Sequence, residues 1–520
     1  MNYADLFRVT LPETALEIAA LVVLVVDLGF LRKTALKARV AVAALLGVAG
    51  CGAAIWALQF QGDAGLSYGT IGESTLLATG GFAQIAQSGI LVLTALTLLL
   101  LIDSDFTRHV GEYVSVVLMA AVGGLLISAA QDLLVIFIGL ELLSLGLYIL
   151  TAFAKSSGKS AEAAMKYYLF GGMSAAFLLF GFSYLYGITG STNLNQIFSA
   201  LAVGEGDSFP LLIVAVVLVF AGLGFKVAAV PFHLWAPDTY EGAPAPAAAF
   251  IASVSKVASF TLLLSIGFAS EHILISGAGF WTRFGAGLGS IRFELLWNVI
   301  LFAAAALSMV VGNLAALAQV SVRRLLAYSA IAHAGYLLLG ITNNHGEVIA
   351  HLPFSRPSPT TDAVLFYILT YGLTTIGAFG VVGVVERATG SDKLDSFLGL
   401  HKRNPVLAAV LLVLFLSLAG IPPLVGFWAK FNLFAAVLGV SAGPVPFALV
   451  ALAVALSAVS LYYYLQVLKR AYVMPAVDET PIKAHPVTLA VLVAIAAAVV
   501  LLGCFPALLQ GWISSAYMMR

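Results

Sequence analysis

Long apolar runs, separated by short polar segments, repeat along almost the whole chain. Each run approaches the roughly 20 residues that a helix needs to cross about 30 Å of hydrocarbon. Backbone groups cannot stay unpaired in lipid, so we interpret these runs as helices. The pattern predicts about fourteen membrane spans, at 11–31, 39–59, 87–102, 111–130, 132–153, 161–187, 209–236, 244–267, 294–318, 322–342, 361–386, 404–439, 446–470 and 486–510.

The distribution of Lys and Arg predicts how these spans are oriented. Basic residues favour the cytoplasmic ends of membrane helices. If the N-terminus lies outside, the inner loops hold 17 of the 25 Lys and Arg residues and the outer segments hold five. We therefore expect both termini on the outer side. The glycine-rich segment 268–293 is predicted to be an outer, interfacial loop rather than a span.

Composition narrows the functional classes. Hydrophobic residues make up 61% of the chain and charged residues 10%, whereas soluble domains carry roughly 25% charged residues. The net charge of zero gives no electrostatic reason to expect nucleic acid as a partner. Cys51 and Cys504 lie in apolar runs without metal-ligand spacing, and no nucleotide-binding motif is present. We expect no cofactor or metal on this chain.

The remaining three basic residues, Lys226, Lys256 and Lys430, fall inside predicted spans, as does one carboxylate, Glu141. A charge at the bilayer centre costs at least about 2.5–3.5 kcal/mol, so such residues usually face a partner, water or the bundle interior. They could snorkel to an interface or form a static ion pair that fixes helix packing. We favour titratable groups that pass protons, with Glu141 and Lys226 as a pair whose separation controls proton release.

Two predicted helix breaks accompany the lysines. Pro231 follows Lys226 in the seventh span, and the string Gly420-Ile421-Pro422-Pro423 precedes Lys430 in the twelfth. Proline opens a membrane helix where the gap lines a polar cavity. Broken helices at corresponding positions of two halves point to a transporter's midplane site.

Histidine and aspartate provide further candidates. His233 and His333 lie within spans, and either could relay protons or serve as a hydrogen-bonded structural residue. A haem is not expected, because it would need paired histidines on facing helices. Asp27 and Asp132, near span ends, are predicted to be interfacial.

Three strings resemble a known family. They are GLGFKVAAVPFHLWAPDTYEGAPAPAAAFIASVSKVA (222–258), RRLLAYSAIAHAGYLLLG (323–340) and SLAGIPPLVGFWAKF (417–431). They are similar to the antiporter-like subunits of complex I, and within these to subunit N of bacterial NADH:quinone oxidoreductase. The resemblance implies an all-α polytopic membrane fold with two inverted five-helix repeats, at 111–267 and 294–470, and broken helices 7 and 12. An N-terminal three-helix segment (1–110), the outer loop (268–293) and a C-terminal helix (471–520) complete it.

The same resemblance implies a function. Glu141 falls on the family's helix-five glutamate, Lys226 and Lys256 on its lysines of helices seven and eight, and Lys430 on a helix-twelve lysine that favours subunit N over subunit M. Such a subunit moves protons, driven by quinone reduction elsewhere, and has no redox site of its own. NADH, FMN, iron–sulfur clusters and quinone are expected in partner subunits. The expected partners are subunits M, K and J and the lipid bilayer, with the chain in the bacterial inner membrane and both termini periplasmic.

Two alternatives remain open from the sequence. A sodium/proton antiporter, or a related hydrogenase or dehydrogenase membrane arm, would share the glutamate and the lysines. A passive membrane scaffold is the other alternative. The insertion cost of three lysines and one glutamate argues against it, because a scaffold has no need of them.

Overall fold

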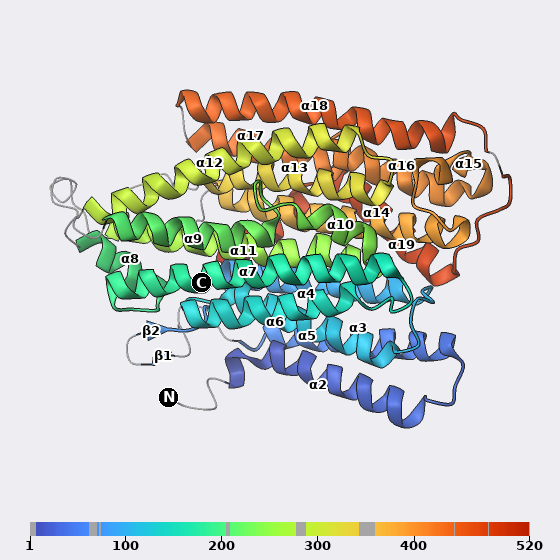
Figure 1. Cartoon of the computed structure of the whole chain (residues 1–520), viewed down its shortest axis with the longest axis horizontal. Helices are drawn as coiled ribbons and strands as arrows, with labels where there is room; N and C mark the ends of the chain where they lie inside the picture. Colours follow the sequence, from blue (N-terminus) through green and yellow to red (C-terminus); the bar gives the residue numbers. More distant parts are fainter. Residues whose placement is uncertain are drawn as a thin grey trace.

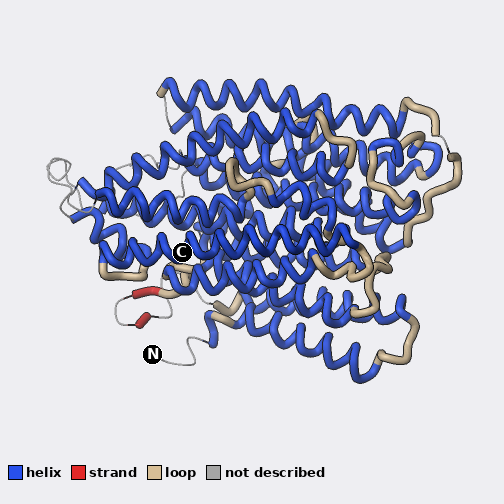
Figure 2. Tube along the Cα trace, viewed as in Figure 1, coloured by secondary structure: helices blue, strands red, loops and turns tan. Residues whose placement is uncertain are grey.

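The computed structural model describes residues 7–61, 70–71, 74–203, 209–276, 288–342, 359–440, 443–476 and 478–518. Its long helices lie side by side in one bundle (Figures 1 and 2). Twelve of the described helices are long and apolar enough to cross a membrane. The all-α polytopic fold predicted from the sequence is therefore confirmed, and the count of fourteen spans stays a prediction.

The N-terminal part contains three helices. They are α2 (Leu11–Val25), which continues into the π-helical η1 (Val26–Phe30), α3 (Leu36–Leu58) and α4 (Gly81–Leu101). Two short antiparallel strands, β1 (Thr70–Ile71) and β2 (Ser74–Thr75), lie between α3 and α4.

The helices of the two predicted repeats follow in order. The first contains α5 (Val110–Ala129), α6 (Leu133–Thr151), α7 (Gly158–Thr189), the short α8 (Leu194–Val203), α9 (Phe209–Val227), α10 (Trp235–Gly242) and α11 (Ala245–Ser276). The second contains α12 (Leu288–Leu317), α13 (Val322–Thr342), α14 (Pro359–Thr389), η3 (Leu394–Phe397), α15 (Leu400–Arg403), α16 (Pro405–Ala419), α17 (Val425–Val440) and α18 (Pro444–Tyr472). Helices α19 (Pro486–Cys504) and α20 (Ala507–Met518) end the described chain. Within the predicted outer loop, α11 continues to Ser276 and α12 begins at Leu288, and residues 277–287 lie outside the described part.

Both predicted helix breaks are present. The seventh predicted span divides into α9 and α10, and the twelfth divides into α16 and α17. At the first break, the amide of Val230 donates to Ser308 Oγ of α12 over 2.9 Å instead of to its own helix. At the second, Gly420 adopts a left-handed conformation (φ 87°), and Gly426 N donates to Ser417 Oγ over 3.1 Å. Side chains thus satisfy backbone groups that the breaks leave free.

A Thr-Gly-Ser turn marks the same place in the two repeats. Helix α7 ends at Thr189-Gly190-Ser191, and α14 ends at Thr389-Gly390-Ser391. Both glycines have φ of 74°, a left-handed conformation that suits glycine at the end of a helix. The first turn precedes α8 at the left of the bundle, and the second precedes α15 at the right (Figure 1). The repeats are therefore inverted relative to one another.

Each turn contacts the start of the second helix of its repeat in the same way. Backbone hydrogen bonds of 2.8 and 2.9 Å join it to the first residues of α6 and α13 respectively. The side-chain hydrogen bond has opposite directions in the two repeats. In the first, Thr192 next to the turn donates to Asp132 before α6 over 2.6 Å. In the second, Ser321 before α13 donates to the carboxylate of Asp392 next to the turn. Asp132, predicted to be interfacial, is a buried partner in this contact.

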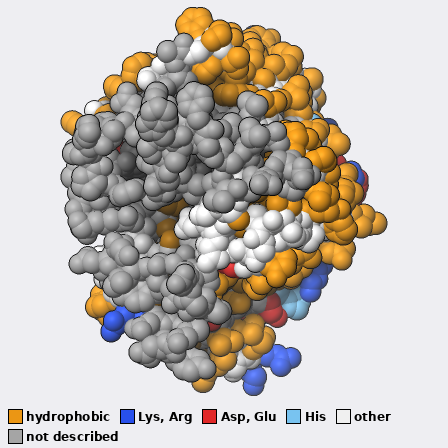
Figure 3. All heavy atoms as spheres, turned by 90° about the vertical axis from the view of Figure 1, so that its left-hand side faces the viewer, with side chains coloured by type: hydrophobic (Ala, Val, Ile, Leu, Met, Phe, Trp, Pro, Cys, Tyr) orange, Lys and Arg blue, Asp and Glu red, His pale blue; other side chains and the backbone are white. Residues whose placement is uncertain are grey.

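The core of the bundle is built around α11, α13 and α14, whose described side chains are almost all buried. Outer helices such as α7 and α18 expose large apolar side chains, including Phe180 and Phe447. Figure 3, which views the left-hand end of Figure 1, shows hydrophobic side chains over much of the described surface. A soluble protein rarely exposes so much apolar surface, and contact with lipid or with neighbouring membrane subunits accounts for it.

Close packing at the second break gives a testable prediction. A methyl group at Gly426 would lie 1.8 Å from the backbone oxygen of Ser417, whereas one at Gly439, in the same helix, would meet nothing within 4 Å. We expect Gly426→Ala to lower stability by about 1–3 kcal/mol, because the start of α17 cannot move away cheaply. Thermal unfolding of the purified complex checks this, with Gly439→Ala as the matched control. Equal melting of the two variants would contradict the predicted packing.

Candidate functional site

Lys226 lies in the last turn of α9 and is buried, with 6% of its surface exposed. Its Nζ donates to Ser144 Oγ of α6. The ammonium also lies 5.9 Å from the centroid of the Tyr148 ring and 5.4 Å from that of Phe225. The Ser144 hydroxyl and the faces of two aromatic rings thus stabilise the ammonium charge inside the bundle.

Glu141 lies on α6, one turn before Ser144, and is half-buried. No ion pair joins Glu141 to Lys226 in the described part of the chain, although Lys226 binds Ser144, which lies only three residues from Glu141 on α6. The predicted pair is therefore close in space but not in direct contact. Ser144 is the residue that Lys226 binds on that helix.

Lys256 lies in the middle of α11 and is 2% exposed. Its Nζ donates to the backbone oxygen of Val227 over 2.6 Å and approaches that of Ala330 in α13 at 3.4 Å. Val227 is the last residue of α9, and the last carbonyls of a helix carry a partial negative charge. The lysine ammonium thus binds the broken end of α9.

Lys430 has the same relation to the second break. It lies in α17 and is buried, and its Nζ donates to the oxygen of Ala419, the last residue of α16, over 3.0 Å. Ser457 Oγ accepts a second hydrogen bond of 2.8 Å, and the Tyr336 ring lies 5.5 Å away. A cleft of about 290 Å³ borders this lysine. In each repeat, then, a buried lysine binds the final carbonyl of a half-helix.

His333 lies between these two lysines. Its Nδ1 is 2.7 Å from the Tyr367 hydroxyl, and its ring centroid is 4.8 Å from that of Tyr371. On α13, Lys256 approaches Ala330, three residues before His333, and Lys430 lies over the ring of Tyr336, three residues after it. A cavity of about 10 Å³ next to His333, Tyr367 and Tyr371 is close to the smallest that holds one water molecule.

His233 lies at the first break, but it is less closely connected to the buried lysines than His333 is. It is half-buried, and its Nδ1 has no hydrogen-bond partner among the described residues. Among the described residues, no hydrogen bond or ion pair joins it to either neighbouring lysine. The structure therefore brings Glu141, Lys226, Lys256, His333 and Lys430 into one region, with His233 beside them.

Two buried carboxylates have environments that the sequence interpretation missed. Asp27, at the end of the first span, is fully buried, and it accepts hydrogen bonds of 2.7 and 2.6 Å from Arg39 and of 3.0 Å from Gly111 N. Glu13 is 5% exposed, and its nearest polar partner is Gln87 Nε2, 3.5 Å from Oε1. The sequence contains a signal for this burial, because Glu13 is an acidic residue within the apolar run of the first predicted span.

A cluster suited to a metal ion is not found among the described residues: no group of three or more His, Cys, Asp or Glu side chains converges there. The buried titratable groups lie instead along the bundle interior, bonded mainly to backbone oxygens and hydroxyls. Such an arrangement is typical of membrane proteins that move small ions through discontinuous helices.

Comparisons with known proteins agree with this class. The family model described as NADH:quinone oxidoreductase/Mrp antiporter, TM matches the chain twice, over residues 130–293 and 286–459. A protein of Acidobacterium capsulatum named NADH-quinone oxidoreductase subunit N 2 is 48% identical over 99% of both chains. Subunit N 1 of Roseiflexus castenholzii is 40% identical over 87% of this chain and 82% of the relative.

A solved structure agrees as well. A chain of respiratory complex I from Thermus thermophilus with bound aureothin superimposes with a TM-score of 0.73 at 33% identity, over 96% of this chain and 98% of that one. The fold and the buried lysines define an antiporter-like multi-pass membrane protein. Within that class, the chain belongs to the subunit N family of bacterial NADH:quinone oxidoreductase.

Substitution of Asp27 and substitution of Glu13 should affect stability to different extents. Asp27→Asn should lower the free energy of unfolding by about 1–3 kcal/mol, because Arg39 would lose its anionic partner. Glu13→Gln should change it by less than about 0.5 kcal/mol, because no cation of the described residues contacts Glu13 and glutamine keeps its shape. Melting temperatures of the two purified variants check this. A larger loss for Glu13→Gln than for Asp27→Asn would contradict the described contacts.

Proposed function

We propose that this chain is a proton-translocating membrane-arm subunit of NADH:quinone oxidoreductase. The observation that carries the proposal is a pair of lysines bonded to the ends of half-helices: Lys256 of α11 binds the end of α9, and Lys430 of α17 binds the end of α16. Together with Lys226 and His333, they form a series of buried groups that can gain and lose protons.

The bonding of these lysines favours a mobile proton over a static ion pair. Neither Lys226, Lys256 nor Lys430 forms an ion pair with a carboxylate in the described chain; their partners are hydroxyls and backbone oxygens. A fixed carboxylate would hold the proton permanently, whereas a neutral acceptor leaves the ammonium only partly compensated. A passive scaffold would not need buried lysines that lack a carboxylate partner.

The helix ends supply the switch. A hydrogen bond to a charged group contributes about 1.5–3 kcal/mol, which corresponds to roughly a 10- to 100-fold change in proton affinity. If a half-helix moves away from its lysine, the ammonium loses that bond and releases its proton more easily. Movement of α9 or α16 thus couples a conformational change, driven by quinone reduction in other subunits, to proton transfer.

The chemistry of the groups favours protons over sodium. A lysine ammonium has three donors and no acceptor, and it repels a second cation. Sodium, a hard cation, would instead need several oxygen ligands. We therefore prefer proton translocation to the sodium/proton antiporter alternative for the site around Lys226, Lys256 and Lys430.

The position of Glu141 supports a role for partner subunits. Along α6, Leu134, Ile138, Leu145 and Ile149 are exposed, and half-buried Glu141 lies in the same helical stripe. A carboxylate facing lipid near the bilayer centre would be costly. We propose that a neighbouring membrane-arm subunit, of the M, K or J type, covers this stripe.

The remaining assignments follow from the same proposal. NADH, FMN, the iron–sulfur clusters and the quinone bind to partner subunits, and this chain contributes no redox site. The protein lies in the bacterial inner membrane with both termini on the periplasmic side, as the distribution of basic loop residues favours.

The test compares proton pumping with electron transfer in Glu141→Gln. In inverted membrane vesicles, we expect NADH-driven acidification and NADH:quinone reductase activity both to fall by at least about tenfold, with the complex still assembled on a native gel. Glu17→Gln, an exposed position on α2, is the matched control and should pump normally. Normal pumping by Glu141→Gln would favour a structural carboxylate and the scaffold alternative.

A further inference from the structure

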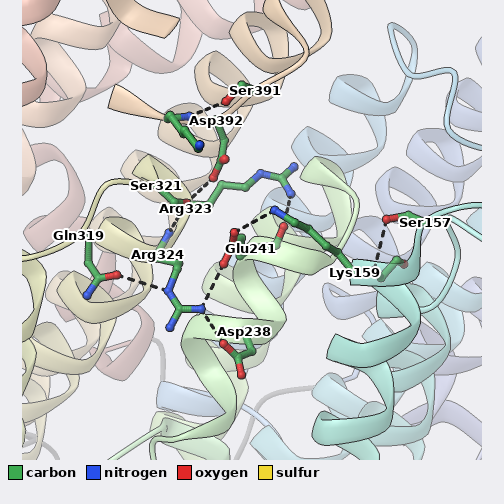
Figure 4. Close-up of polar contacts among 12 residues, drawn as sticks. Ser157, Lys159, Asp238, Glu241, Gln319, Ser321, Arg323, Arg324, Ser391 and Asp392 are labelled. Carbon is green, nitrogen blue, oxygen red and sulfur yellow. Dashed lines mark hydrogen bonds and ion pairs between the residues drawn. The ribbon is translucent and has the colours of Figure 1, made fainter. Parts of the chain in front are cut away.

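Helix α10, the second half of the first broken helix, is held between the two repeats by charged side chains. Its Asp238 contacts Lys166 of α7 at 2.8 Å and Arg324 of α13 at 2.6 Å. Its Glu241 contacts Lys159 of α7 at 3.2 Å and Arg324 at 3.1 Å. Figure 4 shows Arg324 extending from α13 toward both carboxylates. We call these five residues the α10 clamp.

The neighbouring arginine binds the end of α10 itself. Arg323, which is 4% exposed, donates to the backbone oxygens of Glu241 and Ala243 over 2.8 and 2.7 Å. It also forms an ion pair of 2.8 Å with Glu386 of α14. A cation thus binds the carbonyl end of this half-helix too, and the cation comes from the second repeat.

The Asp238 carboxylate of the clamp is ionised at neutral pH. Burial acts to raise the pKa of Asp238, but its bonds to Lys166 and Arg324 outweigh that effect and hold the pKa below its usual range. Since the folded-state pKa is lowered, the stabilisation is complete above the usual value of about 4 and is lost only as the pH falls through the lowered value. A polar cavity of about 170 Å³, which these residues line, lies beside them.

A tryptophan of α10 connects the clamp to the site. Trp235 begins α10, one helical turn before Asp238, and its Nε1 donates to the backbone oxygen of Phe225 over 3.0 Å. Its ring stacks on Tyr167 of α7 with centroids 4.3 Å apart. Phe225 directly precedes Lys226. Because one turn of helix moves as a unit, any displacement of the clamp acts on the end of α9 that Lys226 and Lys256 share.

We propose that Asp238 and Arg324 are positioning residues for proton transfer, and that α10 transmits movement of the second repeat to Lys226 through Trp235. This inference rests on the proposed pumping function. It assigns the clamp a role at a distance from the titratable lysines, because no clamp residue contacts Lys226 or Lys256 in the described chain.

The experiment is a double-mutant cycle in inverted vesicles of the assembled complex. Asp238→Asn weakens the clamp, and Trp235→Phe removes the indole hydrogen bond but keeps an aromatic ring. We expect each to lower NADH-driven acidification roughly fivefold, and the double variant to lower it no further, since both act through one connection. Asp238→Glu, which restores the charge, should recover much of the rate.

Glu162→Gln is the matched control, because Glu162 is exposed and pairs with Lys166 only within α7. Its acidification rate should be unchanged. The proposal is overturned if Asp238→Asn behaves like this control, or if the two single effects multiply to roughly 25-fold in the double variant. If Asp238→Asn fails to assemble, Arg324→Lys, which keeps the charge but loses the forked geometry, tests the same connection by the same cycle.

Lys226→Ala separates this inference from the proposed function. If that variant pumps normally, the pumping site itself is wrong and the cycle says nothing in favour of the clamp. If it is inactive and the cycle is multiplicative, the pump stands and the clamp proposal fails.

Discussion

The structure depends on one constraint: a helix interrupted inside a membrane exposes carbonyl groups that have no water to bind. Unpaired backbone groups at that depth cost several kcal/mol each. A buried lysine ammonium has the complementary problem, since it needs acceptors. The bonds from Lys256 to Val227 and from Lys430 to Ala419 satisfy both groups at once. At both breaks, the helix end needs a donor and the lysine beside it needs an acceptor.

This mutual dependence explains the surrounding architecture. Gly420 and Gly426 bring α17 close enough to the end of α16 for Lys430 to reach it. Ser308 of α12 caps an amide of the first break, so the second repeat supports the broken helix of the first. Lys256 extends that support, because it also approaches Ala330 of α13. A movement of α13 in the second repeat then changes the surroundings of Lys256 in the first.

The sequence was sufficient to predict the helical fold, the two breaks, and the burial of Lys226, Lys256 and Lys430, because apolar periodicity, proline and isolated charges are local signals. It could not supply the partners of these residues. Val227 is 29 positions from Lys256, and Asp238 is 86 positions from Arg324, so only packing brings them together. Burial of Asp27 by Arg39 was missed for the same reason. The repeated Thr-Gly-Ser at 189–191 and 389–391 was a readable signal of the inverted repeats.

The most direct test of the account is NADH-driven proton translocation by Lys256→Met in inverted vesicles, with assembly verified. Lys256 is the best position because both its described partners are backbone oxygens, so the substitution removes the titratable group without leaving a carboxylate unpaired. We expect Lys256→Met to lose pumping while the complex stays assembled, and we expect Lys155→Met, on the surface, to pump normally. Normal pumping by Lys256→Met would contradict the claim that lysines at the helix breaks carry the protons.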